Sequence, residues 1–243
     1  MSGEKSGSGQ CNFRKRRLRF VYGCGENING TLKRLLKSDL DPCFLHDGER
    51  RRGLDQQINF QMAGEAVPYV KKPSEKSWSG ITLPWMSIGY ELKLSPIHTL
   101  TFYNGVANGG KMIQPIIVKR VYKSDKVVQE FETKVLNDKL CSDETLEKVI
   151  DMMQEVVESG TAKNIRNDNY KIAGKTGTAQ IIKKGFYTKN YYTSFCGFFP
   201  ADKPKYSCIV VISEPKGFSQ MGSDVSAPVF KEIADKIYAL DPE

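Results

Sequence analysis

Three segments of the chain place apolar side chains at the three- and four-residue spacing of an α-helix. The first runs from Ser95 to Val106, with Pro96 suited to the first helical position and Asn108-Gly109-Gly110 ending the helix. The second begins at Ser142, a good N-cap, and ends at Ser159. The third, from Val225 to Leu240, has an apolar face made of Val229, Ile233, Ile237 and Leu240. The spacing therefore predicts three amphipathic helices.

Between these helices the residues are typical of β-strands. Two β-rich runs, Pro115–Lys123 and Val127–Thr133, flank a Ser-Asp-Lys turn and predict a hairpin. Three further strands are expected at Tyr170–Ile182, Tyr192–Phe199 and Tyr206–Ser213, with Phe186-Tyr187 and Pro200–Pro204 in the connections. The order of helix, hairpin, helix, three strands and helix predicts an α+β fold in which helices flank an antiparallel sheet.

The first 52 residues lack this periodicity and are strongly basic. They contain 12 of the 36 Lys and Arg residues and six of the 28 Asp and Glu residues, which is +6 of the net charge of +8. We therefore place a boundary at Gly53, between an unmatched basic segment (1–52) and a folded domain (53–243). Two hypotheses stay open for the segment: a frameshifted or misassigned start, or a genuine, unrelated extension of a non-catalytic domain. For a genuine extension, the alternatives are a solvated or disordered tail and a basic tail that binds an anionic partner.

The composition argues against several functions. No apolar run approaches the roughly 20 residues that span a bilayer, and Met1–Arg19 lacks the apolar centre of a secretory signal. The six cysteines show no zinc-binding spacing, and the two histidines, His46 and His98, leave little material for a metal site or a Ser-His-Asp triad. We expect no metal, no cofactor and no specific nucleic-acid partner.

Two glycine-rich stretches look like phosphate-binding loops but do not fit. Gly105–Lys111 has the letters G-x-x-x-x-G-K, yet Met112 stands where a hydroxyl would hold magnesium, and the stretch follows a helix instead of preceding one. It is better interpreted as a helix end. Gly23–Gly30 misses the dinucleotide-binding spacing by two residues.

The clearest candidate site is Lys175-Thr176-Gly177-Thr178, inside a predicted strand. On a strand, Lys175 and Gly177 face one way and the two threonines face the other. An ammonium group supplies charge, hydroxyl groups donate to a carboxylate, and a glycine lets a ligand backbone approach closely. The set predicts recognition of an anionic, extended, peptide-like ligand; the alternative is a plain strand with a solvated lysine.

The stretch from Lys175 to Gln180 resembles the K-T-G motif of the penicillin-recognising serine transpeptidases. Further matches lie upstream in the order found in class B penicillin-binding proteins, mostly of the division-specific type, at 63–66, 78–80, 83–91, 95–97, 104–112 and 160–162. The resemblance covers about residues 53 to 243. It implies the penicillin-binding transpeptidase fold, which is serine β-lactamase-like, incomplete at the N-terminal side.

The resemblance also implies a function. The family cross-links peptidoglycan stem peptides ending in D-Ala-D-Ala by serine acyl transfer, and β-lactams trap its acyl-enzyme. Lys175 would tune the charge of the site, Thr176 and Thr178 would contact the ligand carboxylate, and the main-chain N–H near Thr178 would contribute to an oxyanion hole. A D,D-carboxypeptidase or β-lactamase shares the motif, but the match at 83–91 favours a transpeptidase.

The same resemblance implies a location and partners. The family acts at the periplasmic face of the inner membrane, with the division or elongation machinery, through an N-terminal anchor for which we expect no counterpart here.

Two other motifs of the family are not found. The letters S-x-x-K occur at Ser2–Lys5, in a Gly/Ser-rich terminus, and at Ser213–Lys216, which contains Pro215 and follows a strand. The nucleophile of the family needs the start of a helix, and S-x-N does not occur in the chain. We therefore assign no catalytic residue, and we expect a truncated, inactive domain that a fluorescent penicillin does not label.

Overall fold

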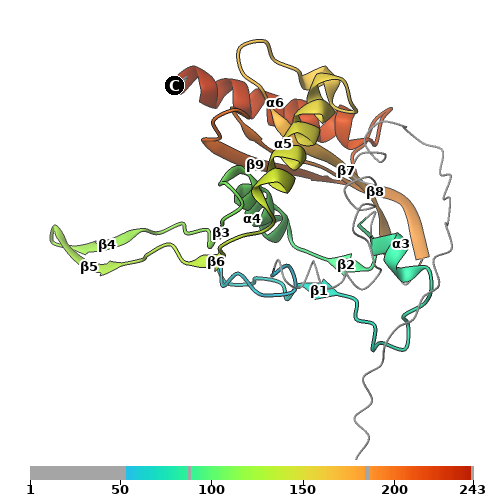
Figure 1. Ribbon diagram of the computed structural model, residues 1–243, viewed down its shortest axis with the longest axis horizontal. Coiled ribbons are helices and arrows are strands. Elements are labelled where there is room, and N and C mark those ends of the chain that lie inside the picture. The colour runs from blue at the N-terminus through green and yellow to red at the C-terminus, as the bar shows by residue number, and fades with distance from the viewer. Residues whose placement is uncertain (1–52, 87–88, 184–185, 242–243) are drawn as a thin grey trace, which may run out of the picture.

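The computed structural model describes residues 53–86, 89–183 and 186–241. Their central feature is an antiparallel sheet of three strands in the order β7 (Ala173–Lys183), β8 (Phe186–Phe199) and β9 (Tyr206–Ser213) (Figure 1). Helix α6 (Gly222–Leu240) packs on this sheet, as do α4 (Pro96–Ala107) and α5 (Asp143–Glu158). The expected α+β fold with helices flanking an antiparallel sheet is confirmed.

Two apolar clusters hold the helices to opposite faces of the sheet. Phe195 and Phe199 of β8 and Phe230 of α6 are completely buried in one cluster. Phe198, also completely buried, belongs to a second cluster with Val106 of α4. Because successive side chains of a strand point to opposite faces, β8 supplies both clusters at once. The core therefore lies above and below β8, the middle strand.

Shorter elements surround this body. They are α3 (Thr82–Met86), the 3₁₀ turn η1 (Lys163–Ile165), and three strand pairs: β1 (Tyr69–Val70) with β2 (Leu92–Lys93), β3 (Met112–Ile113) with β6 (Val135–Asn137), and β4 (Arg120–Lys123) with β5 (Lys126–Glu130). The β4–β5 hairpin projects from the body, and all of its strand residues are exposed (Figure 1). Its turn residues, Ser124 and Asp125, both have positive φ, as a two-residue hairpin turn requires.

Local sequence signals set the helix ends. Ser142 is the N-cap of α5 and accepts a hydrogen bond from the N–H of Thr145 at 3.3 Å. Ser95 is the N-cap of α4, but its hydroxyl pairs with Nδ1 of His98 at 2.6 Å instead of capping the helix. Gly109 and Gly110 follow α4 with φ of 66° and 83°. The interpretation of Gly105–Lys111 as a helix end is therefore confirmed.

Two sequence predictions are corrected. Phe186 and Tyr187 are not a connection: they begin β8, where Lys183 pairs with Phe186 and Ile182 with Tyr187. The side chains at this end of the two strands are exposed, namely those of Ile182, Phe186 and Tyr187. The backbone pairing therefore continues where the sequence has no alternation of buried and exposed residues that would predict a strand.

The buried face of α6 agrees with the prediction only in part: Ile233 and Ile237 are half-buried and pack against the core. Leu240 and Val229 are exposed, and the residues that are fully or largely buried are mostly small: Gly222, Ser226, Ala227, Phe230 and Ala234. Small side chains let the helix approach the strands closely, and the aromatic rings of β8 fill the remaining space. Hydrophobicity alone could not reveal such a face.

Asp235 joins α6 to the loop before β7. Its carboxylate accepts hydrogen bonds from Tyr170 (2.7 Å), Asn167 (2.7 Å) and Lys231 (2.5 Å). Burial alone would raise the pKa of Asp235, but the hydrogen bonds from Lys231 and Tyr170 outweigh it and hold the pKa below its usual value. Folding therefore favours the ionised carboxylate.

This linkage predicts an acid-dependent stability. Because the folded-state pKa of Asp235 is lowered, its contribution is present above its unfolded pKa of about 3.9 and is lost as the pH falls through the folded value. Asp235→Asn is expected to flatten the fall in unfolding free energy between about pH 5 and pH 2, measured by urea titration. Asp151→Asn, on the exposed face of α5, is the control for the change in net charge. An equally steep fall in Asp235→Asn would contradict the assignment.

Candidate active site

The K-T-G residues lie on β7, at one side of the sheet. In the order β7-β8-β9, β7 pairs with β8 on one side and with no other strand of the described residues on its second side. An unpaired strand edge leaves backbone N–H and C=O groups free to bind an extended chain. The site therefore combines a strand edge with the side chains of Lys175 to Thr178.

Lys175 is a half-buried cation. Its Nζ donates to the carbonyl oxygen of Thr176 at 3.0 Å and lies 3.4 Å from the Thr176 hydroxyl. Burial lowers the pKa of the Lys175 ammonium group. In the part of the chain that the structure describes, no carboxylate forms an ion pair with it. Charges removed from water are normally paired, and an anion beside Lys175 would stabilise its ammonium group.

The hydroxyl of Thr176 connects the Lys175 ammonium group to the turn after α5. It shares a 3.2 Å hydrogen bond with the hydroxyl of Thr161, which is exposed beside it. The sequence prediction placed Lys175 and Thr176 on opposite faces of the strand. The long lysine side chain instead folds back along the strand, so that the ammonium group and the hydroxyl meet.

Gly177 and Thr178 face the first turn of α6. The Thr178 hydroxyl accepts a hydrogen bond from the N–H of Gly222 at 3.1 Å. Opposite Gly177 lies Ser194 of β8, whose Oγ occupies the space that a Cβ at position 177 would need. The glycine of the motif therefore leaves room for the Ser194 hydroxyl, which would have to rotate away from a Cβ atom at this position.

The four residues of the K-T-G stretch were predicted from the sequence, whereas no role was predicted for Thr161, Ser194 and Gly222. Thr161 lies in Gly160-Thr161-Ala162, which contributed to the resemblance without a role. Gly222 lies three residues before the predicted start of the last helix, and neither local spacing nor hydropathy marks it. Both approach β7 only through the tertiary fold.

The rejected motifs can now be located. Ser213 is the last residue of β9, and Glu214 after it has positive φ, so Ser213–Lys216 does not begin a helix. Ser2–Lys5 and Gly23–Gly30 lie outside the described residues, as does the whole basic segment. Among the residues that are described, no group of three or more His, Cys, Asp or Glu side chains could hold a metal ion.

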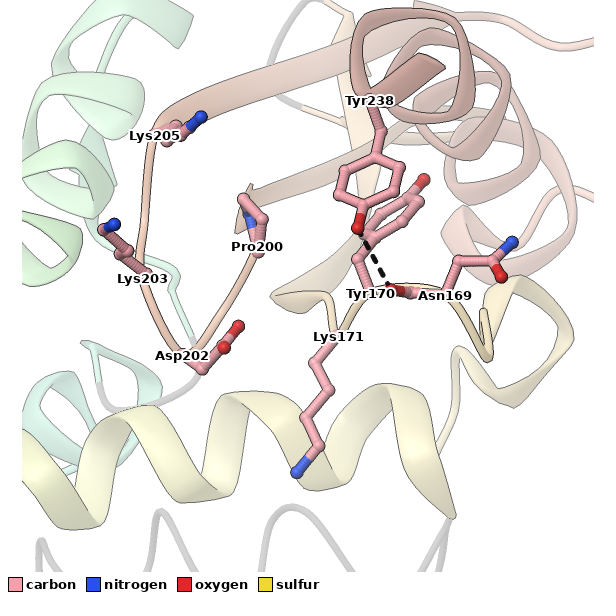
Figure 2. A pocket seen from close by; sticks show the side chains of 8 residues that line it. All are labelled: Asn169, Tyr170, Lys171, Pro200, Asp202, Lys203, Lys205 and Tyr238. Carbon is pink, nitrogen blue, oxygen red and sulfur yellow. Dashed lines mark hydrogen bonds between the residues drawn. The ribbon is translucent and has the colours of Figure 1, made fainter. Parts of the chain in front are cut away.

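A cavity of about 610 Å³ lies away from the K-T-G residues, between the loop before β7, the β8–β9 turn and the end of α6. Its lining includes the stacked rings of Tyr170 and Tyr238, 4.4 Å apart, and the Tyr238 hydroxyl donates to the carbonyl of Asn169. Figure 2 shows that the Lys171 and Lys203 side chains point in different directions, so they do not converge on one anion. None of Lys175 to Thr178 lines it.

Comparison with known proteins decides the family. Residues 36–235 match the penicillin-binding protein transpeptidase domain. The chain belongs to this family. The match begins inside the basic segment, before Gly53, so family sequence reaches into that segment; the boundary itself stays a prediction.

Individual relatives agree with this assignment. Penicillin-binding protein PbpB of Mycolicibacterium smegmatis is 31% identical over 88% of this chain and 34% of its own length. A peptidoglycan D,D-transpeptidase FtsI homolog of Mesostigma viride is 33% identical over 63% of this chain and 28% of its own length. The chain therefore spans about a third of the length of these curated relatives.

The fold is shared with solved structures as well. Penicillin-binding protein 3 of Mycobacterium tuberculosis, solved in complex with aztreonam, aligns with a TM-score of 0.75 at 28% identity. The alignment covers 88% of this chain and 49% of that one. The predicted penicillin-binding transpeptidase fold is confirmed. Within the described residues of our chain, no helix is both long and apolar enough to cross a membrane.

Proposed function

We propose that the chain is part of a D,D-transpeptidase and that β7 binds the terminal carboxylate of a peptidoglycan stem peptide ending in D-Ala-D-Ala. The observation that carries the proposal is the half-buried ammonium group of Lys175, which has no carboxylate partner among the described residues. A ligand carboxylate would supply the missing negative charge, and a charge-assisted hydrogen bond contributes about 1.5–3 kcal/mol.

The same site is proposed to bind β-lactams, with their anionic group in the position of the peptide carboxylate. In support, the aligned mycobacterial structure holds the β-lactam aztreonam. Thr176 and Thr178 are proposed to donate to the ligand carboxylate, and the free edge of β7 to pair with the ligand backbone. We assign no acylated serine in this chain, so the proposal for the described residues concerns recognition.

Location and partners follow from the family resemblance. We propose that the protein acts at the periplasmic face of the inner membrane with the cell-division or elongation machinery. The names of relatives, such as the FtsI homolog, support this in part. The alternative of a basic tail that binds an anionic partner receives no support from the comparisons.

The test is binding of benzylpenicillin and of its uncharged methyl ester, measured by ligand-observed NMR titration. The wild-type chain is expected to prefer the acid, and Lys175→Met to weaken acid binding about tenfold, or about 1.4 kcal/mol, with little change for the ester. Lys203→Met is the control, because Lys203 is exposed and lines the separate cavity.

A wild-type chain that binds acid and ester equally would overturn the carboxylate proposal. A fluorescent penicillin that stays attached on a denaturing gel would overturn a different point, since it would reveal an acylated nucleophile that we did not assign. The NMR titration tests recognition of the carboxylate and the gel tests acylation, so each result can contradict its own point without deciding the other.

A further inference from the structure

The first turn of α6 lies unusually close to the K-T-G strand. A Cβ atom at Gly222 would stand 2.5 Å from the carbonyl oxygen of Gly177 and 2.7 Å from that of Ser194. Both neighbours are backbone atoms of the sheet, so they cannot rotate away as a side chain could. Gly222 does not have positive φ, so the position needs a residue without a side chain and not an unusual backbone. Only glycine lets α6 approach this closely.

This close approach lets the backbone of α6 bond to the motif. The N–H of Gly222, at the first position of the helix, donates to Oγ1 of Thr178 at 3.1 Å. A helix leaves its first N–H groups without partners inside the helix, so this donor is available for Thr178. The contact therefore gives the N–H of Gly222 a hydrogen-bond acceptor and restricts the orientation of the Thr178 hydroxyl.

The orientation matters because a threonine hydroxyl has one proton and two lone pairs. When one lone pair accepts from Gly222, the hydroxyl proton must point elsewhere. A free hydroxyl would rotate among several partners, and a ligand would have to stop that rotation. The bond from Gly222 removes the orientations in which the Thr178 proton would point at α6, so fewer orientations remain to be fixed when a ligand binds.

Two other contacts attach the N-terminal part of α6 to the rest of the domain, one in its first turn and one in its second. Asn164 of η1 donates from Nδ2 to the carbonyl oxygen of Ser223 at 2.8 Å. Ser226 and Thr193 of β8 share a buried 3.0 Å hydrogen bond between their hydroxyls. The donor at Gly222 is thus part of a fixed contact between the helix and the sheet.

We propose that Gly222 is a positioning residue for the ligand site: it orients the Thr178 hydroxyl to donate to a carboxylate. The proposal rests on the function proposed above and adds a residue outside the K-T-G motif. It acts through Thr178 and makes no contact with the ligand itself.

The experiment compares the ratio of the dissociation constants for benzylpenicillin methyl ester and benzylpenicillin across variants of the full chain. Gly222→Ala is expected to lower this ratio several-fold, toward the value for Thr178→Val. In the Thr178→Val background, Gly222→Ala should produce no further change in the ratio, because the hydroxyl is already gone. Thr178→Ser keeps the hydroxyl and should restore the wild-type ratio.

Ser226→Ala is the matched control. It removes the buried hydrogen bond to Thr193 one turn further along α6 and leaves the bond between Gly222 and Thr178 in place. We expect it to lower the unfolding midpoint but to leave the ratio unchanged. A folded Gly222→Ala with a wild-type ratio would overturn the inference, whereas a wild-type chain with a ratio of one would overturn the proposed function.

If Gly222→Ala does not fold, a second measurement on the wild-type chain and Thr178→Val tests the coupling between the Gly222 amide and the Thr178 hydroxyl. The backbone amide of Gly222 in the wild-type chain should shift in the NMR spectrum when benzylpenicillin binds and much less with the ester. Its hydrogen exchange should become faster in Thr178→Val, which removes the acceptor. An amide that responds to neither change would contradict the coupling.

Discussion

Replacing Phe230 with alanine is expected to lower the free energy of unfolding by about 3–5 kcal/mol. Phe230 has no exposed surface and lies at the contact between α6 and β8. Its ring meets those of Phe195 and Phe199 edge to face, with centroids 4.7 Å and 5.8 Å apart. The substitution therefore removes buried apolar surface, leaves a cavity, and breaks aromatic contacts worth about 0.5–1.5 kcal/mol each.

Phe218→Ala is the matched control, because the Phe218 side chain is fully exposed. Its effect on stability is expected to stay within about 0.5 kcal/mol. Urea unfolding followed by circular dichroism measures both variants. If Phe230→Ala costs no more than Phe218→Ala, α6 does not pack on the sheet as described.

The second large effect is expected from Gly197→Ala, which should destabilise the fold by about 1–3 kcal/mol. A Cβ at Gly197 would overlap the carbonyl oxygen of Ala173 and stand 2.9 Å from the Cα of Gly174. Both atoms belong to the backbone of β7, so the two strands must separate next to Lys175. The cost arises from overpacking, the reverse of the cavity at Phe230.

Gly80→Ala provides the comparison for this substitution. No atom lies within 4 Å of the Cβ position at Gly80, and its φ is not in the left-handed region. We expect a change in unfolding free energy within about 0.5 kcal/mol, measured in the same urea titration. A neutral Gly197→Ala would show that β7 and β8 can separate without cost at this point.

Many elements could be predicted from the sequence because their signals are local. The helix at Ser142–Ser159 has its cap, its periodicity and its terminating glycine within a single segment, and α5 follows them closely. Tyr206–Ser213 is bounded by turn residues and is β9 without a change of limits. The predictions that were wrong involve residues whose environment comes from elsewhere in the chain, such as the exposed start of β8 and the small-residue face of α6.

The family, the fold class and the position of the K-T-G residues on a strand could be predicted from the sequence, since each depends on residue types at short spacing. The tertiary structure decided what these residues contact. It leaves the Lys175 ammonium group half-buried without a carboxylate partner in the described residues, and it brings Thr161 and Gly222 to the threonine hydroxyls. Gly222 is 44 residues from Thr178, and only the packing of α6 on the sheet brings them together. The burial of Lys175 and the hydrogen bonds between distant segments both depend on this packing, which local sequence patterns do not specify.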